Sequence, residues 1–523
     1  MAATDSLCRS FLDLWWHFDP APATAARLGD FDAESIRQHA AALRSIAAAL
    51  EELEIDDVAE EIDRTALLDH LRVLLFRLQH EHPYQRNPLL WIEHLAVAFA
   101  SPLAQPPGND VAAASALERM RALPKFSRTA QDALRLPPQI LLDAALDMLP
   151  HVVALVSDCE ARFRDVWENG RPRETGEGEG AVRSGDHSRI VDEAKAALRA
   201  LEAALRSEIL PDPDPHAGAI GEAEADRRLH HEHASIHNAA EVWRGALRLA
   251  TEVEAEVTAL AALVDSGRPW REVYAACANG PLSEPQMRVR FAESLAAART
   301  FSAGKGIGGP DFTPIEVEAL SGPELVLEAV VAYHAAGRRP AAVRLGAITP
   351  AAMPWLAARI GVPGLHLIET RTDQLPGEVR RHIAASSTPA GWALFAEELM
   401  IELGYEPDPE SRLIERVLFL REMHLALVDI GLHTRQLTAE EAVAHLATRI
   451  PLDRRIALAD VRRLLSRPLS ACAAMLGWQE LRRLREDYAR SRSTFALPGF
   501  LEELFSYGGL PVPLIRWGMG IET

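Results

Sequence analysis

Apolar residues recur every three or four positions through most of this sequence, and this spacing constrains the fold more than any other feature. Between Ala33 and Leu53 they lie at three- and four-residue steps in an Ala-rich background, as in an amphipathic helix. The same spacing predicts helices over residues 63–79, 138–167, 188–209, 237–266, 390–403, 411–432 and 457–477. Strand signals are limited to two short apolar runs, Ala342–Leu345 and Leu365–Ile368. We therefore predict a mainly all-α fold with at most a very small β element.

Helix boundaries and loop composition favour a single helical body over residues 1–523. Thr438 to Glu441 forms a capping box, and Asp408-Pro409 begins the helix that carries Asp429. Residues 168–187 are rich in Gly, Glu and Arg and predict a mobile surface loop, and residues 302–323 are rich in helix breakers. A division into two lobes around a central cleft, at about residues 1–300 and 301–523, is left open.

The net charge narrows the choice of partners. Asp and Glu number 75 against 55 Lys and Arg, so the formal charge is -20. A field of this sign repels phosphate backbones, so we expect no nucleic-acid partner.

Cysteine spacing and the N-terminal residues carry the prediction of location. The four cysteines, Cys8, Cys159, Cys277 and Cys472, lie far apart and form no CxxC pair, which favours reduced thiols over a metal site. The first residues carry no basic segment leading into an apolar run, and no stretch of about 18 uncharged apolar residues occurs. These features predict a cytoplasmic protein without a membrane partner.

Two motif-like segments have simpler explanations. Gly304–Gly309 formally matches GxGxxG, but a predicted helix precedes it and Pro310 follows, so we expect a loop. His230, His231, His233 and His237 form the densest imidazole cluster, and on one helix His230, His233 and His237 would share a face. Such spacing can hold a transition metal, although a solvated helix face is the commoner outcome.

Three segments of the C-terminal third carry a family resemblance. They are Gly391–Glu397 (GWALFAE), Asp429–Thr434 (DIGLHT) and Gly508–Leu514 (GGLPVPL). In this order they resemble the bacterial domain-of-unknown-function 885 family, whose fold is similar to the carboxypeptidase Taq zinc metallopeptidases. Pro20–Phe31 also resembles the opening of that family. The resemblance implies a large helical metallopeptidase-like body with a central cleft.

The residues that would hold zinc are replaced. The family motif His-Glu-x-x-Pro-Gly-His-His aligns with Pro363-Gly364 so that Arg359, Ile360 and Leu365 take the first His, the Glu and the next-to-last His, and His366 remains. Ala390 takes the place of the Glu before Gly391, and Ala474 that of a later Tyr, whereas Pro468 is kept. Catalytic zinc needs about three ligands and a carboxylate base. We therefore predict no metal, no cofactor and no zinc peptidase activity.

Three functions remain open for a chain of this kind. In the first, which we favour, a metal-free relative keeps a cleft for an anionic small molecule or peptide. Arg359 and Arg435 would then bind the anion beside Trp392, and His366, His433 and Asp429 would supply acid–base chemistry. Arg359 could instead form a salt bridge with Glu369 or Glu397, and Asp429 and His433 could be a structural pair.

The second function is an inert scaffold, a pseudoenzyme whose partner is another protein. The third is an active hydrolase with its metal relocated to the cluster at residues 230–237. Both homo-oligomers and hetero-oligomers are compatible with the sequence.

Overall fold

Helices make up most of the protein, and the part of the chain that the structure describes holds one small sheet. The computed structural model describes residues 3–19, 27–106, 108–169, 186–278, 280, 282–308, 313–328, 330–335 and 340–521. In the sheet, β1 (Ile315–Ala319) runs parallel to the central strand β3 (Ala341–Leu345), and β2 (Val331–His334) runs antiparallel to it. The predicted mainly all-α class is confirmed.

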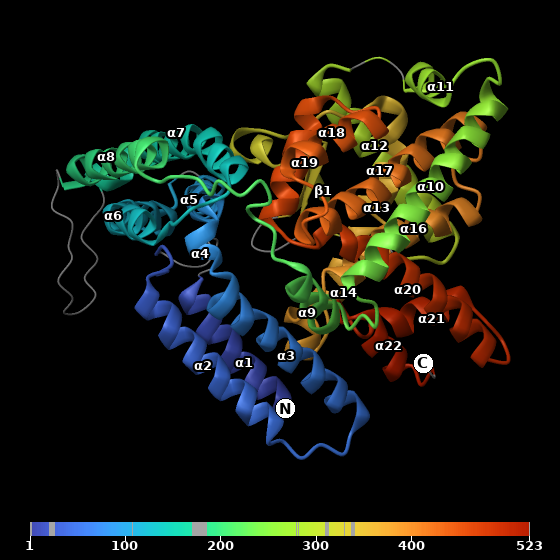
Figure 1. Ribbon diagram of the computed structural model, residues 1–523, viewed down its shortest axis with the longest axis horizontal. Helices are drawn as coiled ribbons and strands as arrows, with labels where there is room; N and C mark the ends of the chain where they lie inside the picture. Colours follow the sequence, from blue (N-terminus) through green and yellow to red (C-terminus); the bar gives the residue numbers. More distant parts are fainter. Residues whose placement is uncertain are drawn as a thin grey trace.

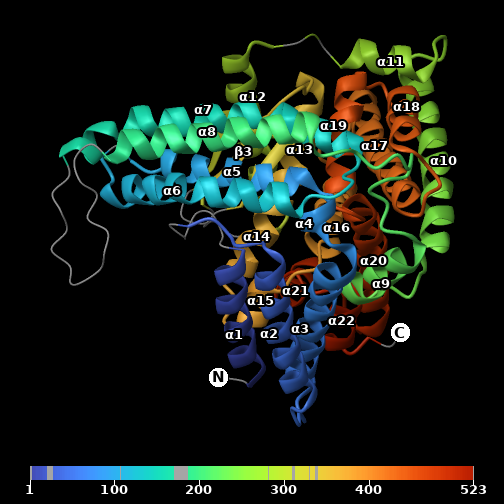
Figure 2. The ribbon, with the colours of Figure 1, turned by 60° about the vertical axis from the view of Figure 1, so that its left-hand side comes forward.

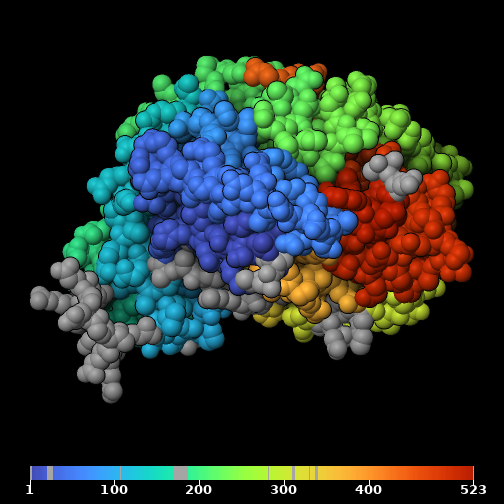
Figure 3. Space-filling view, turned by 90° about the horizontal axis from the view of Figure 1, so that it is seen from below, coloured from blue at the N-terminus to red at the C-terminus, as the bar shows by residue number. Residues whose placement is uncertain are grey.

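The N-terminal helices form a bundle that packs against the C-terminal end of the chain. The bundle consists of α1 (Ala3–Phe18), α2 (Ala33–Glu51) and α3 (Val58–Phe76). Helix α1 contacts α15 (Glu378–His382), and α3 contacts α22 (Val512–Gly518). The view from below shows the two ends of the chain side by side (Figure 3). Residues far apart in the sequence therefore share one core here, including the buried Phe11, Leu71 and Val512.

A second group of helices extends from this bundle as a layer of long rods (Figure 2). A π-helix, η1 (Arg77–Glu81), and α4 (Pro83–Arg86) lead into α5 (Pro88–Leu103), α6 (Asp110–Ala133), α7 (Gln139–Asn169) and α8 (Asp186–Ser207). Among the described helices, α7 alone is long and apolar enough to cross a membrane. It packs on α5, α6 and α8, and much of its apolar face lies in the main core, as in a core helix of a globular protein.

The remaining elements form a larger body around the sheet, on the right of Figure 1. Before and around the sheet lie α9 (Glu222–His233), α10 (Ala239–Val264), α11 (Trp270–Cys277), α12 (Glu284–Gly304), η2 (Gly322–Val326) and η3 (Pro350–Ala352). After it come α13 (Met353–Ile360), α14 (Leu365–Asp373), α16 (Ser387–Glu402), α17 (Pro409–His433), α18 (Ala439–Arg449), α19 (Arg454–Ser466), α20 (Ser470–Ser491) and α21 (Leu497–Phe505). One hydrophobic core continues from the bundle into this body, and a second lies between α12, α13 and the sheet.

Helices α16 and α20 cross at a pair of glycines. A Cβ atom on Gly391 would lie 2.3 Å from the carbonyl carbon of Gly477, and a Cβ atom on Gly477 would lie 1.9 Å from the carbonyl oxygen of Ser387. Both distances are far below van der Waals contact, so the two backbones approach as closely as they do because neither residue has a side chain.

Most helices predicted from periodicity are present, with ends shifted by a few residues. The capping box at Thr438 and the cap by Asp408 are also confirmed. The strand predicted at Ala342–Leu345 is β3, but Leu365–Ile368 is not a strand, because α14 begins at Leu365. A short apolar run does not distinguish a strand from a buried helix.

The helix predicted over residues 457–477 is wrong, since α19 and α20 are separate helices. The chain turns at Pro468, which cannot donate a helical hydrogen bond, and at Leu469, whose φ of 64° is left-handed. Four sequence predictions fall wholly or partly outside the described residues: most of the loop at 168–187, the start of Pro20–Phe31, Gly309 of the glycine motif, and part of 302–323. The division into two lobes stays a prediction.

The glycine crossing makes a testable prediction about stability. Gly477→Ala should lower the free energy of unfolding by about 1–3 kcal/mol, because the added methyl group forces α16 and α20 apart. Gly245→Ala is the matched control: Gly245 lies within α10, and no atom would lie within 4 Å of an added Cβ. This variant should gain about 0.5–1 kcal/mol from helix propensity. Thermal unfolding measures both, and equal melting temperatures for the two variants would contradict the close crossing.

Candidate functional site

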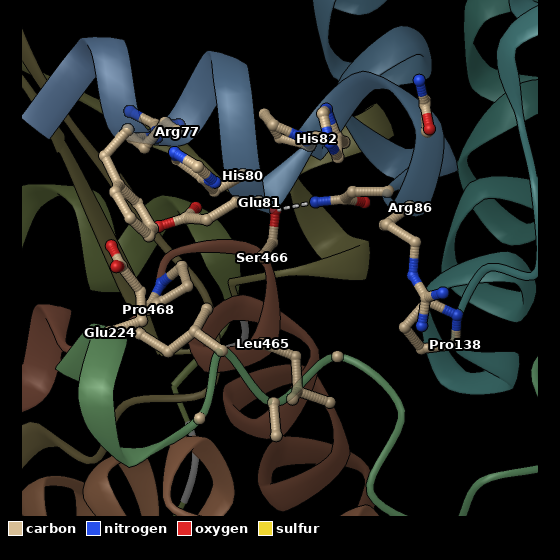
Figure 4. A pocket seen from close by; sticks show the side chains of 18 of the residues that line it. Arg77, His80, Glu81, His82, Arg86, Pro138, Glu224, Leu465, Ser466 and Pro468 are labelled. Carbon is tan, nitrogen blue, oxygen red and sulfur yellow. Dashed lines mark hydrogen bonds between the residues drawn. The ribbon is translucent and has the colours of Figure 1, made fainter.

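A cavity of about 720 Å³ lies where the N-terminal bundle, the layer of long helices and the C-terminal body meet. We call it the junction cavity. Four separate segments line it: η1 and α4, the loop around Pro138, residues 218–228 at the start of α9, and the turn between α19 and α20 (Figure 4). Its size is typical of a small-molecule site.

An irregular helix end places the charged side chains of one wall. At Arg77 the α-helix α3 widens into the π-helix η1, in which the amide of His82 donates to the carbonyl of Arg77 at 3.1 Å. His82 then adopts a left-handed conformation, with φ 50° and ψ 54°, and Pro83 begins α4. Single π-turns and left-handed residues other than glycine concentrate at functional sites. The local geometry brings Arg77, His80, Glu81 and His82 to the same cavity.

A buried arginine joins two carboxyl groups at the cavity. Arg228 donates to both oxygens of Glu81, at 2.6 Å and 2.5 Å, and its Nε atom lies 3.6 Å from Glu224. Burial, together with a hydrogen bond with Glu81, raises the pKa of Glu224 to about 8. Burial also acts to raise the pKa of Glu81, but the charge of Arg228 outweighs it and the pKa lies below its ordinary value. At neutral pH the pair therefore holds one proton, on Glu224.

The cavity is locally cationic although the whole chain is acidic. Its lining contains five arginines, at positions 77, 86, 135, 227 and 228, and three glutamates, at positions 81, 222 and 224. Since Glu224 is protonated at neutral pH, the count is five positive charges against two negative ones. The cavity thus differs in sign from the net charge of -20.

The arginines differ in their freedom to meet a ligand. Arg86 is paired with Asp212 at 2.6 Å, and Arg228 with Glu81. Arg77 forms no ion pair with any described residue, and its Nε atom is buried without a hydrogen-bond partner among them. Arg135 donates to the carbonyl of Leu134 at 2.7 Å and pairs with no described carboxylate. Arg227 donates to Glu224 at 3.2 Å, so Arg77 and Arg135 are the two lining arginines without a described carboxylate partner.

Asp429 and His433, predicted from the sequence as acid–base residues, stand behind the cavity wall. The carboxylate of Asp429 accepts hydrogen bonds from the amides of Leu469, Ala471 and Cys472, at the start of α20. Burial raises the pKa of Asp429 to about 7, although these three donors oppose the rise. Neither side chain belongs to the lining of the junction cavity.

His433 holds the C-terminal end of α19. Its Nε2 atom lies 3.1 Å from the carbonyl of Leu464, which can only accept, so Nε2 carries the proton. Burial lowers the pKa of His433 to about 4 and keeps the ring neutral. Its carbonyl accepts from the amide of Gly221 at 2.9 Å, which ties α9 to the same place. The pair thus positions the turn at Leu465–Pro468 that forms one cavity wall.

Arg359, predicted to bind substrate, lies buried between two carboxylates. Its guanidinium donates to Glu397 at 2.7 Å and 3.0 Å and to Glu422 at 2.8 Å. Burial raises the pKa of Glu397 to about 7, against the lowering effect of Arg359. The pKa of Arg359 itself is raised: burial acts to lower it, but the carboxylates outweigh burial. Of the two partners suggested from the sequence, Glu397 is the one in contact.

The residues beside Arg359 keep a tightly packed turn. A Cβ atom on Gly364 would lie 1.8 Å from the carbonyl oxygen of Arg359. The indole of Trp392 donates to the carbonyl of Pro363 at 2.8 Å, so this predicted binding residue is fully buried against the turn. The Nε2 atom of His366 lies 2.9 Å from the carbonyl of Thr313, and its Nδ1 atom lies 3.0 Å from the hydroxyl of Tyr333.

The structure therefore separates the six residues singled out from the sequence. Asp429 and His433 lie together. Arg359, His366 and Trp392 lie on or beside the turn at Pro363, and none of these five lines the junction cavity. Arg435 is exposed and pairs with Asp214 at 3.0 Å.

Sequence reasoning missed Glu81, Glu224 and Arg228. The run His80-Glu81-His82 directly before Pro83 was a local signal for Glu81.

The sequence suggested that His230, His233 and His237 share one helix face, but the structure does not arrange them in this way. Helix α9 ends at His233, because Ala234 is left-handed with φ 51°, so His237 lies outside it. His231 contacts Asp69 at 2.9 Å, His237 lies 3.7 Å from Glu241, and His233 is buried. Within the described residues, no group of three or more His, Cys, Asp or Glu side chains could hold a metal ion.

Comparisons with known proteins agree on family and fold. The model of a bacterial protein family of unknown function, DUF885, matches residues 19–519. No curated protein sequence matches the chain. A solved structure from Shewanella oneidensis, described as a putative lipoprotein of unknown function, is 18% identical, with a TM-score of 0.76 over 99% of this chain and 100% of that one. Another, described as a putative lipoprotein from Colwellia psychrerythraea, is 16% identical, with a TM-score of 0.80 over 99% and 98%.

The descriptions of these two structures contradict the predicted cytoplasmic location, because a lipoprotein is held at a membrane by its lipid. The prediction rested partly on four unpaired cysteines. Cys8, Cys159 and Cys472 are buried in the described structure, so their spacing reports packing and not the redox state of a compartment.

The ion pairs of Arg359 make a prediction with a defined pH dependence. Arg359→Met should cost about 3–5 kcal/mol of unfolding free energy near pH 8, since it leaves Glu397 buried without a cation. The pKa of Glu397 is raised, so its protonation favours the folded state, and the loss should shrink near pH 5. The control is Arg121→Met, which removes an exposed pair with Glu118 and should cost at most about 1 kcal/mol at either pH. Chemical denaturation at both pH values measures the losses, and an equal loss for Arg359→Met at both would contradict the buried pairing.

Proposed function

This chain belongs to the bacterial DUF885 family of proteins of unknown function, and we propose that it is a metal-free member that binds an anionic small molecule or peptide in the junction cavity. The proposal has two parts, the absence of a metal requirement and the charge of the ligand. Each part rests on different residues and has its own test.

The metal-free part rests on the positions that the family resemblance assigns to zinc ligands. Arg359 cannot ligate a cation, and its guanidinium already neutralises Glu397 and Glu422. Ile360, Leu365 and Ala390 offer no donor atom. A divalent cation beside Arg359 would meet an existing positive charge, so these residues do not fit a zinc ion.

Metal content tests this part directly. After dialysis against buffer with trace zinc, elemental mass spectrometry of untagged protein should find less than about a tenth of an equivalent, because a stable site needs about three protein ligands. The His233→Ala variant is the control for the histidine cluster, and it should bind the same small amount. Close to one equivalent in the natural protein would overturn the metal-free proposal. Loss of that metal in His233→Ala would then place the ion at residues 230–237.

The cationic lining of the junction cavity is the observation that carries the second part. In a chain with a net charge of -20, a cavity with more arginines than glutamates attracts anions against the overall field. Arg77 and Arg135 have no described carboxylate partner, so an incoming carboxylate or phosphate would pair with guanidinium groups that no described carboxylate neutralises. Acid–base chemistry at this site would fall to Glu224, which is protonated at neutral pH.

Calorimetric titration of the full chain with succinate, citrate and inorganic phosphate tests the anion site. Arg77→Gln and Arg135→Gln should each weaken binding by about tenfold, the usual value of a charged hydrogen bond. The matched control is Arg121→Gln, an exposed arginine on α6 outside the cavity lining, which should bind as the natural protein does.

The same titration has an expected pH dependence. Affinity for succinate, which stays doubly ionised between about pH 6.5 and 9.5, should fall as the pH rises through about 8. Over this range Glu224 loses its proton and adds a negative charge to the cavity. Glu224→Gln should remove the dependence and keep the higher affinity. If none of the three anions binds, or if all variants bind alike, the anion proposal is wrong and the scaffold function becomes the better one.

A further inference from the structure

A second cavity, of about 370 Å³, lies beside the junction cavity. Residues of α2 and of the segment from Leu78 to Gln85 line it, and we call it the side cavity. It shares His82, Pro83 and Gln85 with the junction cavity. The turn between η1 and α4 is therefore a common wall, and His82 on this turn is exposed (Figure 4).

The two cavities differ in chemistry. The side cavity is walled mainly by apolar groups, namely Ala33, Ile36, Ala40, Leu78, Pro83 and Tyr84. Among the described residues, its lining contains no Asp or Glu. Of its two arginines, Arg37 is already paired with Glu34 at 2.5 Å and Arg44 is exposed. The side cavity thus offers contact area to hydrocarbon, whereas the junction cavity offers charge.

We propose that the ligand is a small amphiphilic anion, with its charged head in the junction cavity and an apolar arm that crosses His82 and Pro83 into the side cavity. The inference rests on the proposed anion site and narrows its ligand class. The two cavities share three lining residues, and His82 in their common wall is exposed, so the arm of one molecule would pass over this wall. The left-handed turn at His82 presents its side chain at this boundary.

If the apolar arm binds in the side cavity, the affinity for carboxylate ligands should depend on the length of their alkyl chain. Each methylene group that leaves water on binding should strengthen binding by about two- to fourfold until the side cavity is full. Titrations of the full chain with butanoate, hexanoate, octanoate and decanoate, each below its aggregation concentration, should therefore give rising affinity followed by a plateau.

Two variants test whether the apolar arm of the ligand lies in the side cavity. Ala33→Trp fills part of the cavity from an exposed position, so it should fold, and Ala40→Phe fills it from a buried one. Both should abolish the gain from hexanoate to decanoate and leave butanoate binding unchanged. Ala41→Trp is the matched control, because Ala41 is exposed on the same helix outside the lining, and it should keep the full gain.

The outcomes separate this inference from the proposed anion site. Binding of all four carboxylates with equal affinity would overturn the amphiphilic ligand and leave the anion site standing. A chain-length gain that survives in Ala33→Trp would also overturn it, since the arm would then lie elsewhere. Failure of butanoate, succinate and phosphate alike to bind would refute the anion site itself, and the inference would fall with it.

Discussion

A guanidinium that is buried among helices must be matched by carboxylates, and Arg359 shows how far this requirement extends. Its partner Glu422 also contacts Arg421, and the alternation of charge continues across the body to α5. In order, the members are Glu397, Arg359, Glu422, Arg421, Asp460, Arg463, Glu328, Arg467 and Glu93. Each charge between the two end members, Glu397 and Glu93, has a partner of opposite sign on both sides. The chain of pairs therefore fixes α5, α13, α16, α17 and α19 relative to one another.

This chain of ion pairs ends at the wall of the junction cavity. Arg467 lies between the wall residues Ser466 and Pro468, and both Arg467 and Ser466 contact Glu93, at 3.0 Å and 3.4 Å. From the other side, Asp429 and His433 hold the same turn through backbone groups. A wall that is held from two sides presents its residues to a ligand in one arrangement, which lowers the entropic cost of binding.

The sequence predicted features that depend on local pattern, and it failed where distant segments meet. Helices were predicted from periodicity. A salt bridge of Arg359 with Glu369 or Glu397 was one of the alternatives left open, and the structure shows the one with Glu397. The break at Pro468 was missed, because the carboxylate that caps the amide of the next residue, Leu469, belongs to Asp429, 40 residues before Leu469. The junction cavity could not be predicted either. Its walls come from four segments, and the link between Glu81 and Arg228 spans 147 residues.

The burial of Glu224 makes the junction cavity more strongly cationic. With both Glu81 and Glu224 ionised, two adjacent negative charges would have to be balanced by Arg228, which is bidentate to Glu81, and by the exposed Arg227, whose Nε atom lies 3.2 Å from Glu224. Burying Glu224 as a neutral carboxyl group costs less free energy than burying a second carboxylate, so Glu224 stays protonated. Arg228 then neutralises Glu81, and Arg77 and Arg135 have no described carboxylate partner. The affinity for anions that we propose would thus be strengthened by a carboxyl group that stays neutral, because a neutral Glu224 leaves two negative charges against the five arginines of the lining.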